Sequence, residues 1–172
     1  MELISKHELV AALYEAAIPS LEAFFKAHEN EFFYGFCVEI LAEEGYFHVG
    51  ASSVESFQPT IASYLKDGFS LEDIMGDGIR WNNQEWAYFD LNYDCGIWEK
   101  EWQSTLDRLN AHKTYMYNLR DPEAAVSCEA FASLFEAAGR EAFQKIIASG
   151  ILDTPKKTPD FRAFVFEHHD VF

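Results

Sequence analysis

Residues 32–41 read FFYGFCVEIL, and this stretch decides the fold. Aromatic and β-branched residues fill most of its positions, which is typical of a β-strand. Because apolar side chains fall on both alternating faces, the strand should be central in its sheet and covered, or nearly so, on both sides. We therefore expect the rest of the chain to supply neighbouring strands and a layer over each face.

The segments next to this strand predict a hairpin and a preceding helix. Residues 43–45, Glu-Glu-Gly, favour a tight turn, and the alternation over 46–51 predicts a second strand. Upstream, Ser5 and Glu8 have the spacing of a capping box, and apolar residues recur behind them at every fourth position. Pro19 lies inside this predicted helix and should kink or divide it, because proline removes a backbone donor.

The remaining elements complete an α+β pattern. The order helix, hairpin, helix, short strand, helices, strand predicts a single α+β domain over residues 1–172, with a mainly antiparallel sheet of about four strands packed with several helices. The downstream segments that we expect are a helix ending near 66, a loop at 67–78 that contains one helical turn at 71–75, a short strand at 78–81, helices at about 96–115 and 121–150, an exposed connector at 153–160 and a strand at 161–167.

Composition and charge restrict the classes of function. Hydrophobic residues make up 49% of the 172 positions and aromatic residues 16%, which is ample for a buried core. The formal net charge is −16, so phosphate backbones and anionic membranes should repel the chain. A basic protein would instead be attracted to it. We expect no nucleic-acid or membrane binding, and a basic protein as the partner, although surface carboxylates also serve solubility alone.

The cysteines and the N-terminal sequence indicate a cytoplasmic protein. Cys37, Cys95 and Cys128 are odd in number and widely spaced, which is typical of reduced thiols rather than disulfides. The first residues lack the basic and apolar regions of a signal peptide. No apolar run approaches the roughly 18 residues that a membrane span needs. The oligomeric state is not predicted.

No motif for catalysis, cofactor or metal binding appears. The histidines are scattered, and the adjacent pair at 168–169 would point to opposite faces of a strand, so we expect no metal site. No glycine-rich phosphate loop is present, and we expect no cofactor. An unidentified hydrolase using Cys37, His48 and a nearby acid remains as an alternative, although a buried thiol beside a half-buried histidine is the simpler interpretation.

Aromatic and acidic residues concentrate between 67 and 101. Two tryptophans flank a polar segment in IRWNNQEWAYF, residues 79–89. Aromatic side chains with a rim of carboxylates suit the binding of a basic protein, but the same aromatic residues also suit a core. The candidate anchors, for either role, are Arg80, Trp81 and Trp86. The candidate acidic partner face is Asp73, Asp77, Glu85, Asp90 and Asp94.

Several short segments resemble a known bacterial family. LYEAA at 13–17, EFFYGF at 31–36, IRWNNQEWAY at 79–88 and a closing apolar strand before residues 168–170 are similar to those of the "domain of unknown function 4303" family, in the same order along nearly the whole chain. In that family the tryptophan matching Trp86 is the signature residue, and no enzymatic activity is assigned. The chain departs from the family at Pro19 and Pro59, which interrupt helices, and at the 168–169 histidine pair.

These observations leave three functional hypotheses. The first is a non-enzymatic, cytoplasmic protein-binding domain, for which an immunity protein that neutralises a basic toxin is the analogue that the resemblance suggests. The second is an accessory or regulatory domain without a toxin partner. The third is the hydrolase alternative. The identity of any partner or ligand does not follow from the sequence.

Overall fold

The structure, a computed structural model, describes residues 4–42, 45–76, 78–92, 96–118 and 123–167. The chain folds as a single α+β domain. Its helices and strands in chain order are α1 (Lys6–Ala27), β1 (Phe32–Leu41), β2 (Tyr46–Ser53), α2 (Gln58–Lys66), α3 (Leu71–Met75), the 3₁₀ helix η1 (Asn83–Glu85), α4 (Gly96–Tyr117), α5 (Glu123–Ala148), the 3₁₀ helix η2 (Ile151–Asp153) and β3 (Lys156–Glu167).

The sheet within the described residues has three strands in the order β2-β1-β3, so β1 is central as predicted. Strands β1 and β2 are antiparallel, with Phe36 opposite Ala51. Strands β1 and β3 are parallel, with Phe36 opposite Ala163. The prediction of a mainly antiparallel sheet of about four strands was therefore wrong in both number and direction. The long α4–α5 pair brings the chain back to the end of the sheet where β1 begins, which makes the last strand run parallel to β1.

The predicted short strand at 78–81 is also absent from the described part of the chain. Residues 78–81 instead form bends and turns, in which the Arg80 amide donates to the Ile74 carbonyl at 3.2 Å. The Asn82 amide similarly donates to the Ile79 carbonyl. These local bonds satisfy the backbone without a sheet partner, so an apolar-aromatic pattern here produced a turn rather than a strand.

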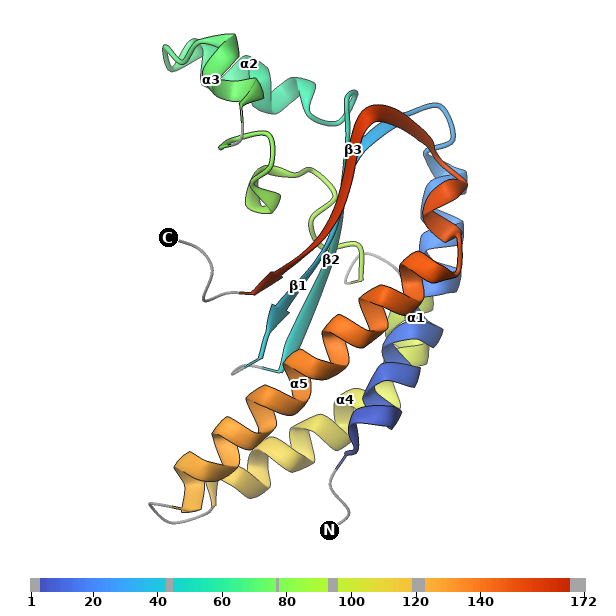
Figure 1. The fold of residues 1–172 in the computed structure, drawn as a ribbon, viewed down its shortest axis with the longest axis vertical. Helices are drawn as coiled ribbons and strands as arrows, with labels where there is room; N and C mark the ends of the chain where they lie inside the picture. Colours follow the sequence, from blue (N-terminus) through green and yellow to red (C-terminus); the bar gives the residue numbers. More distant parts are fainter. Residues whose placement is uncertain (1–3, 43–44, 77, 93–95, 119–122, 168–172) are drawn as a thin grey trace.

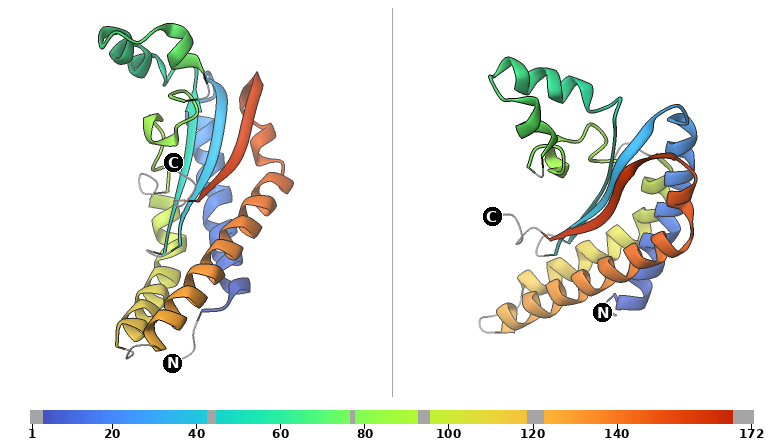
Figure 2. Two further views of the ribbon diagram at one scale, coloured as in Figure 1. Left: turned by 60° about the vertical axis from the view of Figure 1, so that its left-hand side comes forward. Right: turned by 45° about the horizontal axis from the view of Figure 1, so that its top comes forward.

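Each face of the sheet has its own cover. Helices α1, α4 and α5 pack against one face, which we call the helix face (Figure 1). The segment from Phe57 to Trp86, including α2, α3 and η1, lies on the opposite side, which we call the loop face (Figure 2). Strand β1 is buried from Phe33 to Ile40, which confirms the prediction of a strand covered on both sides.

The helix face holds the main core. The Phe36 ring stacks on Phe143 of α5, with 6.4 Å between ring centroids. At Gly139 of α5 an added Cβ would lie 2.6 Å from side-chain atoms of both Ile40 and Phe47. A glycine is therefore needed at this position for α5 to approach the hairpin this closely. Helix α5 continues through Gly139. Helix α1 likewise continues through Pro19, which therefore does not divide it.

The outer edge of β2 is covered by residues 88–92. The Ala51 amide donates to the Tyr88 carbonyl at 2.9 Å, and the Leu91 amide donates to the Val49 carbonyl at 3.0 Å. The side-chain amide of Asn92 continues this pairing, because it accepts from the Val49 amide and donates to the Phe47 carbonyl. Edge groups that could pair with another chain are thereby satisfied internally.

Candidate partner-binding surface

The tryptophan stretch at 79–89 is fixed to the loop face of the sheet by Trp86. Only 3% of Trp86 is exposed, and its ring lies where a Cβ on Gly35 would come within 2.5 Å of it. The Trp86 indole N–H donates to the Arg80 carbonyl at 2.9 Å. Tyr34, Cys37, Phe57 and Ile74 complete this second buried cluster. Trp86 is therefore a core residue and offers no surface to a partner.

Arg80 and Trp81 join the stretch to β3. The Arg80 guanidinium forms an ion pair with Asp160 at 2.7 Å and lies 4.6 Å from the centre of the Tyr34 ring. Guanidinium groups of both Arg80 and Arg162 lie over the Trp81 ring, at 5.0 Å and 4.3 Å from its centre. Cation–π contacts of this kind stabilise partly buried aromatic rings. All three predicted anchors thus contribute to packing within the domain.

The described carboxylates of the predicted acidic face lie on separate elements and have separate local partners. Asp77 and Asp94 lie outside the described residues. Asp73 belongs to the N-terminal capping box of α3, where it accepts from Ser70. Glu85 accepts from the Tyr64 hydroxyl at 2.7 Å, and Asp90 lies 2.5 Å from Nδ1 of His48. Each described carboxylate therefore has a local role on a different element.

The structure reveals an exposed apolar surface on α2 and α3 that the sequence reasoning missed. None of the nine residues of α2, all of which are described, is buried. Figure 1 shows α2 and α3 projecting beyond the sheet on the side away from α1, α4 and α5. We call residues 58–75 the arm. Its exposed apolar residues are Leu65 (47% exposed), Phe69 (45%), Leu71 (55%) and Met75 (39%).

Carboxylates lie among these apolar side chains. Asp67, Glu72 and Asp73 are all exposed and lie within the same short segment. Large apolar groups left in water are unfavourable unless a partner covers them, and an acidic rim favours a partner of positive charge.

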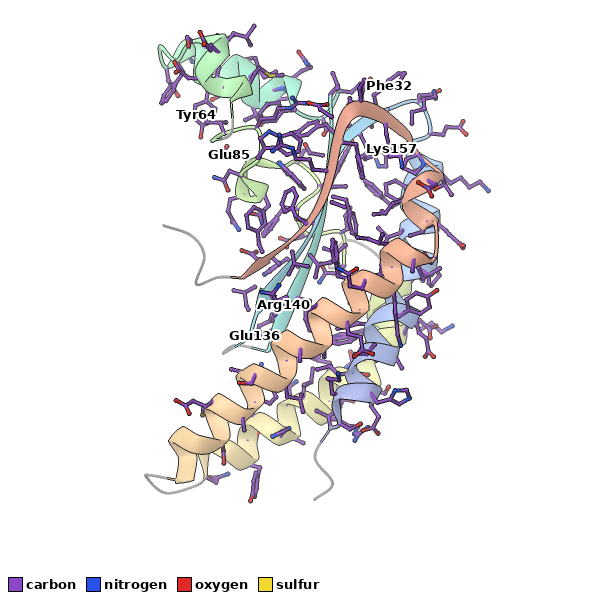
Figure 3. The ribbon with its side chains drawn as sticks, in the orientation of Figure 1. Phe32, Tyr64, Glu85, Glu136, Arg140 and Lys157 are labelled. Carbon is purple, nitrogen blue, oxygen red and sulfur yellow. The ribbon has the colours of Figure 1, made fainter. Side chains whose placement is uncertain are left out.

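The arm is held at its base and by one polar contact. Phe57 and Ile74 are buried in the cluster around Trp86, which fixes the two ends of the arm to the sheet. Figure 3 shows Tyr64 of α2 and Glu85 of η1 facing each other, the pair joined by the 2.7 Å hydrogen bond. The hydrogen bond that Tyr64 donates to the Glu85 carboxylate raises the pKa of the Tyr64 phenol. The phenol therefore stays protonated and keeps donating at neutral pH. The exposed apolar side chains are left outside these contacts.

A polar network joins the ends of α1 and β2 to the tryptophan stretch. The Glu31 carboxylate accepts from the Ser53 and Tyr88 hydroxyls and lies 2.7 Å from His28 Nδ1. Burial raises the pKa of Glu31, but these hydrogen bonds outweigh it and hold the pKa below its ordinary value. Burial, reinforced by Glu31, raises the pKa of Tyr88 to about 12. The network is therefore ionised at Glu31 and protonated at Tyr88 at neutral pH.

The residues of the hydrolase hypothesis are not arranged for nucleophilic attack. Cys37 is fully buried, and burial together with the charge of Glu39 raises its pKa far above neutral. Its strand neighbour across the hairpin is Gly50, whereas His48 lies opposite Glu39 and stacks on Phe89. A nucleophile must be exposed and readily ionised, and this thiol is neither.

Two further observations concern the described residues as a whole. No group of three His, Cys, Asp or Glu side chains among them is placed to hold a metal ion. No helix within the described ranges is long and apolar enough to cross a lipid bilayer.

Comparison with known proteins identifies a family but no characterised relative. Comparison with curated proteins and with solved structures found no match. The family model described as "Domain of unknown function (DUF4303)" matches residues 13–169, which is nearly the whole chain and includes both the tryptophan stretch and the arm. The chain therefore belongs to the DUF4303 family.

Proposed function

We propose that this protein is a non-enzymatic protein-binding domain that uses the arm to capture a basic partner protein. The observation that carries the proposal is the exposure of Leu65, Phe69 and Leu71 on a projecting segment that also carries exposed carboxylates. Apolar side chains supply burial in a complex, and carboxylates supply attraction to a cationic surface. The net charge of −16 extends that attraction beyond the arm.

The cytoplasm is the proposed location. Cys37 and Cys128 are both free thiols, and Cys128 is exposed. An exposed thiol persists in a reducing compartment, whereas secreted domains tend to pair their cysteines. A cationic toxin is one partner with the required chemistry, and in that case the chain is an immunity protein. An accessory or regulatory role with a different basic partner uses the same surface.

Affinity capture from the native cytosol tests the proposal. Immobilised wild-type protein is compared with a Leu65→Ser/Leu71→Ser variant, and with Ile147→Ser as a matched control. Ile147 is also an exposed aliphatic residue (40%), but it lies on α5, away from the arm. We expect a protein of high isoelectric point that the wild type and the control retain, that the arm variant loses, and that salt releases steeply.

Two results would contradict the proposal. One is capture of the same proteins by the arm variant and the wild type. The other is a partner that is acidic and indifferent to salt. Once a basic partner is purified, inhibition of a toxic activity of that partner by the wild-type chain distinguishes the immunity role from an accessory role.

A further inference from the structure

A second feature that the arm does not explain is a cavity between β2 and the first turns of α4. Its volume is about 230 Å³, and its walls include the aromatic rings of Tyr46, Phe47, Trp98 and Trp102. Since a water molecule occupies about 30 Å³ of liquid, the cavity suits the end of one side chain or a small amine rather than a nucleotide. None of the residues that line it belongs to the arm.

The cavity lining contains several polar side chains but one charged side chain, the carboxylate of Glu99. Asn92 lines it, but both ends of its amide are engaged by the backbone of β2. Gln103 lines it as well and donates to Asp107 at 2.9 Å. Tyr46 adds a hydroxyl and the two tryptophans add indole N–H donors, whereas Glu99 adds an exposed carboxylate, for which the described residues provide no ion pair or hydrogen bond. Because Glu99 is the one charged side chain in the lining, a positive charge on the ligand is favoured where the ligand reaches this carboxylate.

The aromatic walls favour the same class of ligand. Trp98 and Trp102 both line the cavity, and their ring centres lie 5.9 Å apart at an angle of 39°. Tryptophan is the aromatic side chain that attracts cations most strongly. The Tyr46 ring already attracts a cation of the chain itself, because the Lys113 ammonium lies 4.5 Å from its centre.

We propose that this cavity, lined by Tyr46, Phe47, Trp98, Trp102 and Glu99, is a binding site for an organic cation on an alkyl stem, an ammonium or guanidinium group. The stem packs against Phe47 and the tryptophans, and the charged end reaches Glu99. Both a free alkylamine and a lysine or arginine side chain of another protein have this chemistry.

Nuclear magnetic resonance of the indole N–H groups tests the site directly. The intact protein is titrated with butylammonium, with blocked N-acetyl-lysine methylamide and with 1-pentanol, which is a neutral molecule of similar size. We expect saturable shifts of Trp98 and Trp102 with the two cations, while Trp81 and Trp86 stay in place. Tighter binding of the lysine derivative indicates a protein side chain as the natural ligand, and tighter binding of butylammonium indicates a free amine.

Variants that remove one carboxylate distinguish a cation-binding site from a cavity that binds any apolar molecule. Glu99→Gln should weaken cation binding about two- to fivefold, as expected for the loss of an exposed ion pair. Glu101→Gln, which removes an exposed carboxylate of the same helix outside the lining, should change it by less than about twofold. Equal binding of pentanol and butylammonium, equal effects of the two variants, or no saturable shift would each overturn the proposal.

Discussion

The two faces of the sheet are stabilised in different ways. On the helix face, three long helices cover β1 and β2 with one continuous apolar core. On the loop face, a smaller cluster around Trp86 anchors an irregular segment whose projecting arm buries none of α2. The comparison shows that burial is divided unevenly between the faces, and our proposal assigns recognition to the less buried one. Large apolar side chains are buried under the helices and remain exposed on the arm.

A substitution in the helix-face core should have the largest effect. Phe36→Ala removes a fully buried ring that stacks on Phe143, and we expect a loss of about 3–5 kcal/mol in the free energy of unfolding. Urea denaturation followed by circular dichroism measures the loss. A loss below about 1 kcal/mol would mean that the helix face does not hold the fold as described.

Trp86→Ala tests the anchor of the loop face. We expect a loss of about 3 kcal/mol, because a buried indole and its hydrogen bond to the Arg80 carbonyl are removed together. Hydrogen exchange should show earlier opening of residues 57–92 than of α5. A fully stable Trp86→Ala protein that had lost only its partner would instead make Trp86 a binding residue.

The polar network at Glu31 should make the junction of the two faces sensitive to acid. The pKa of Glu31 is below its ordinary value of 4.5 in the folded protein, so its stabilising contribution is present above pH 4.5 and is lost as the pH falls below it. Glu31→Gln should cost about 1–2 kcal/mol at pH 7, where hydrogen bonds to a charged acceptor are lost.

The measurement is the melting temperature from pH 7 down to pH 3. The difference between wild type and Glu31→Gln should shrink as the pH falls, whereas the exposed neighbour Glu29→Gln should follow the wild type throughout. A constant difference between wild type and Glu31→Gln at every pH would argue against ionised Glu31 as the acceptor in this network.

The arm should show the smallest effect on stability. Leu65→Ser/Leu71→Ser removes apolar groups that are about half exposed, so the free energy of unfolding should change by less than about 0.5 kcal/mol per site. The same urea denaturation provides the measurement. A loss of several kcal/mol would show that these side chains support the fold, and any loss of partner binding by this variant would then follow from unfolding.

The sequence predicted the elements whose pattern is set locally. The density of apolar residues in 32–41 was enough to place β1 at the centre of the sheet, and the capping box at Ser5 and Glu8 marked the start of α1. The direction of β3 could not be predicted in this way, because it depends on where α4 and α5 return the chain. The segment 153–160 was expected to be an exposed connector because of its prolines, yet β3 begins at Lys156.

Proline is tolerated there for a structural reason. Pro159 lies where the pairing register between β1 and β3 is interrupted, so its missing N–H leaves no ladder bond unmade.

The exposure of the arm could not be predicted for a different reason. Ile61 and Leu65 repeat with helical spacing whether the helix is covered or exposed, and only the tertiary structure shows that Leu65 stays about half exposed.

The parallel pairing of β1 with β3 also sets an order for folding. Phe36 and Ala163 lie opposite each other although one is near the start of the chain and the other near its end. Contacts between such distant segments form late, because the loop between them must first be closed. During synthesis the β1–β2 hairpin is complete while one edge of β1 still awaits a partner. The sheet described here is therefore completed only after β3 has left the ribosome.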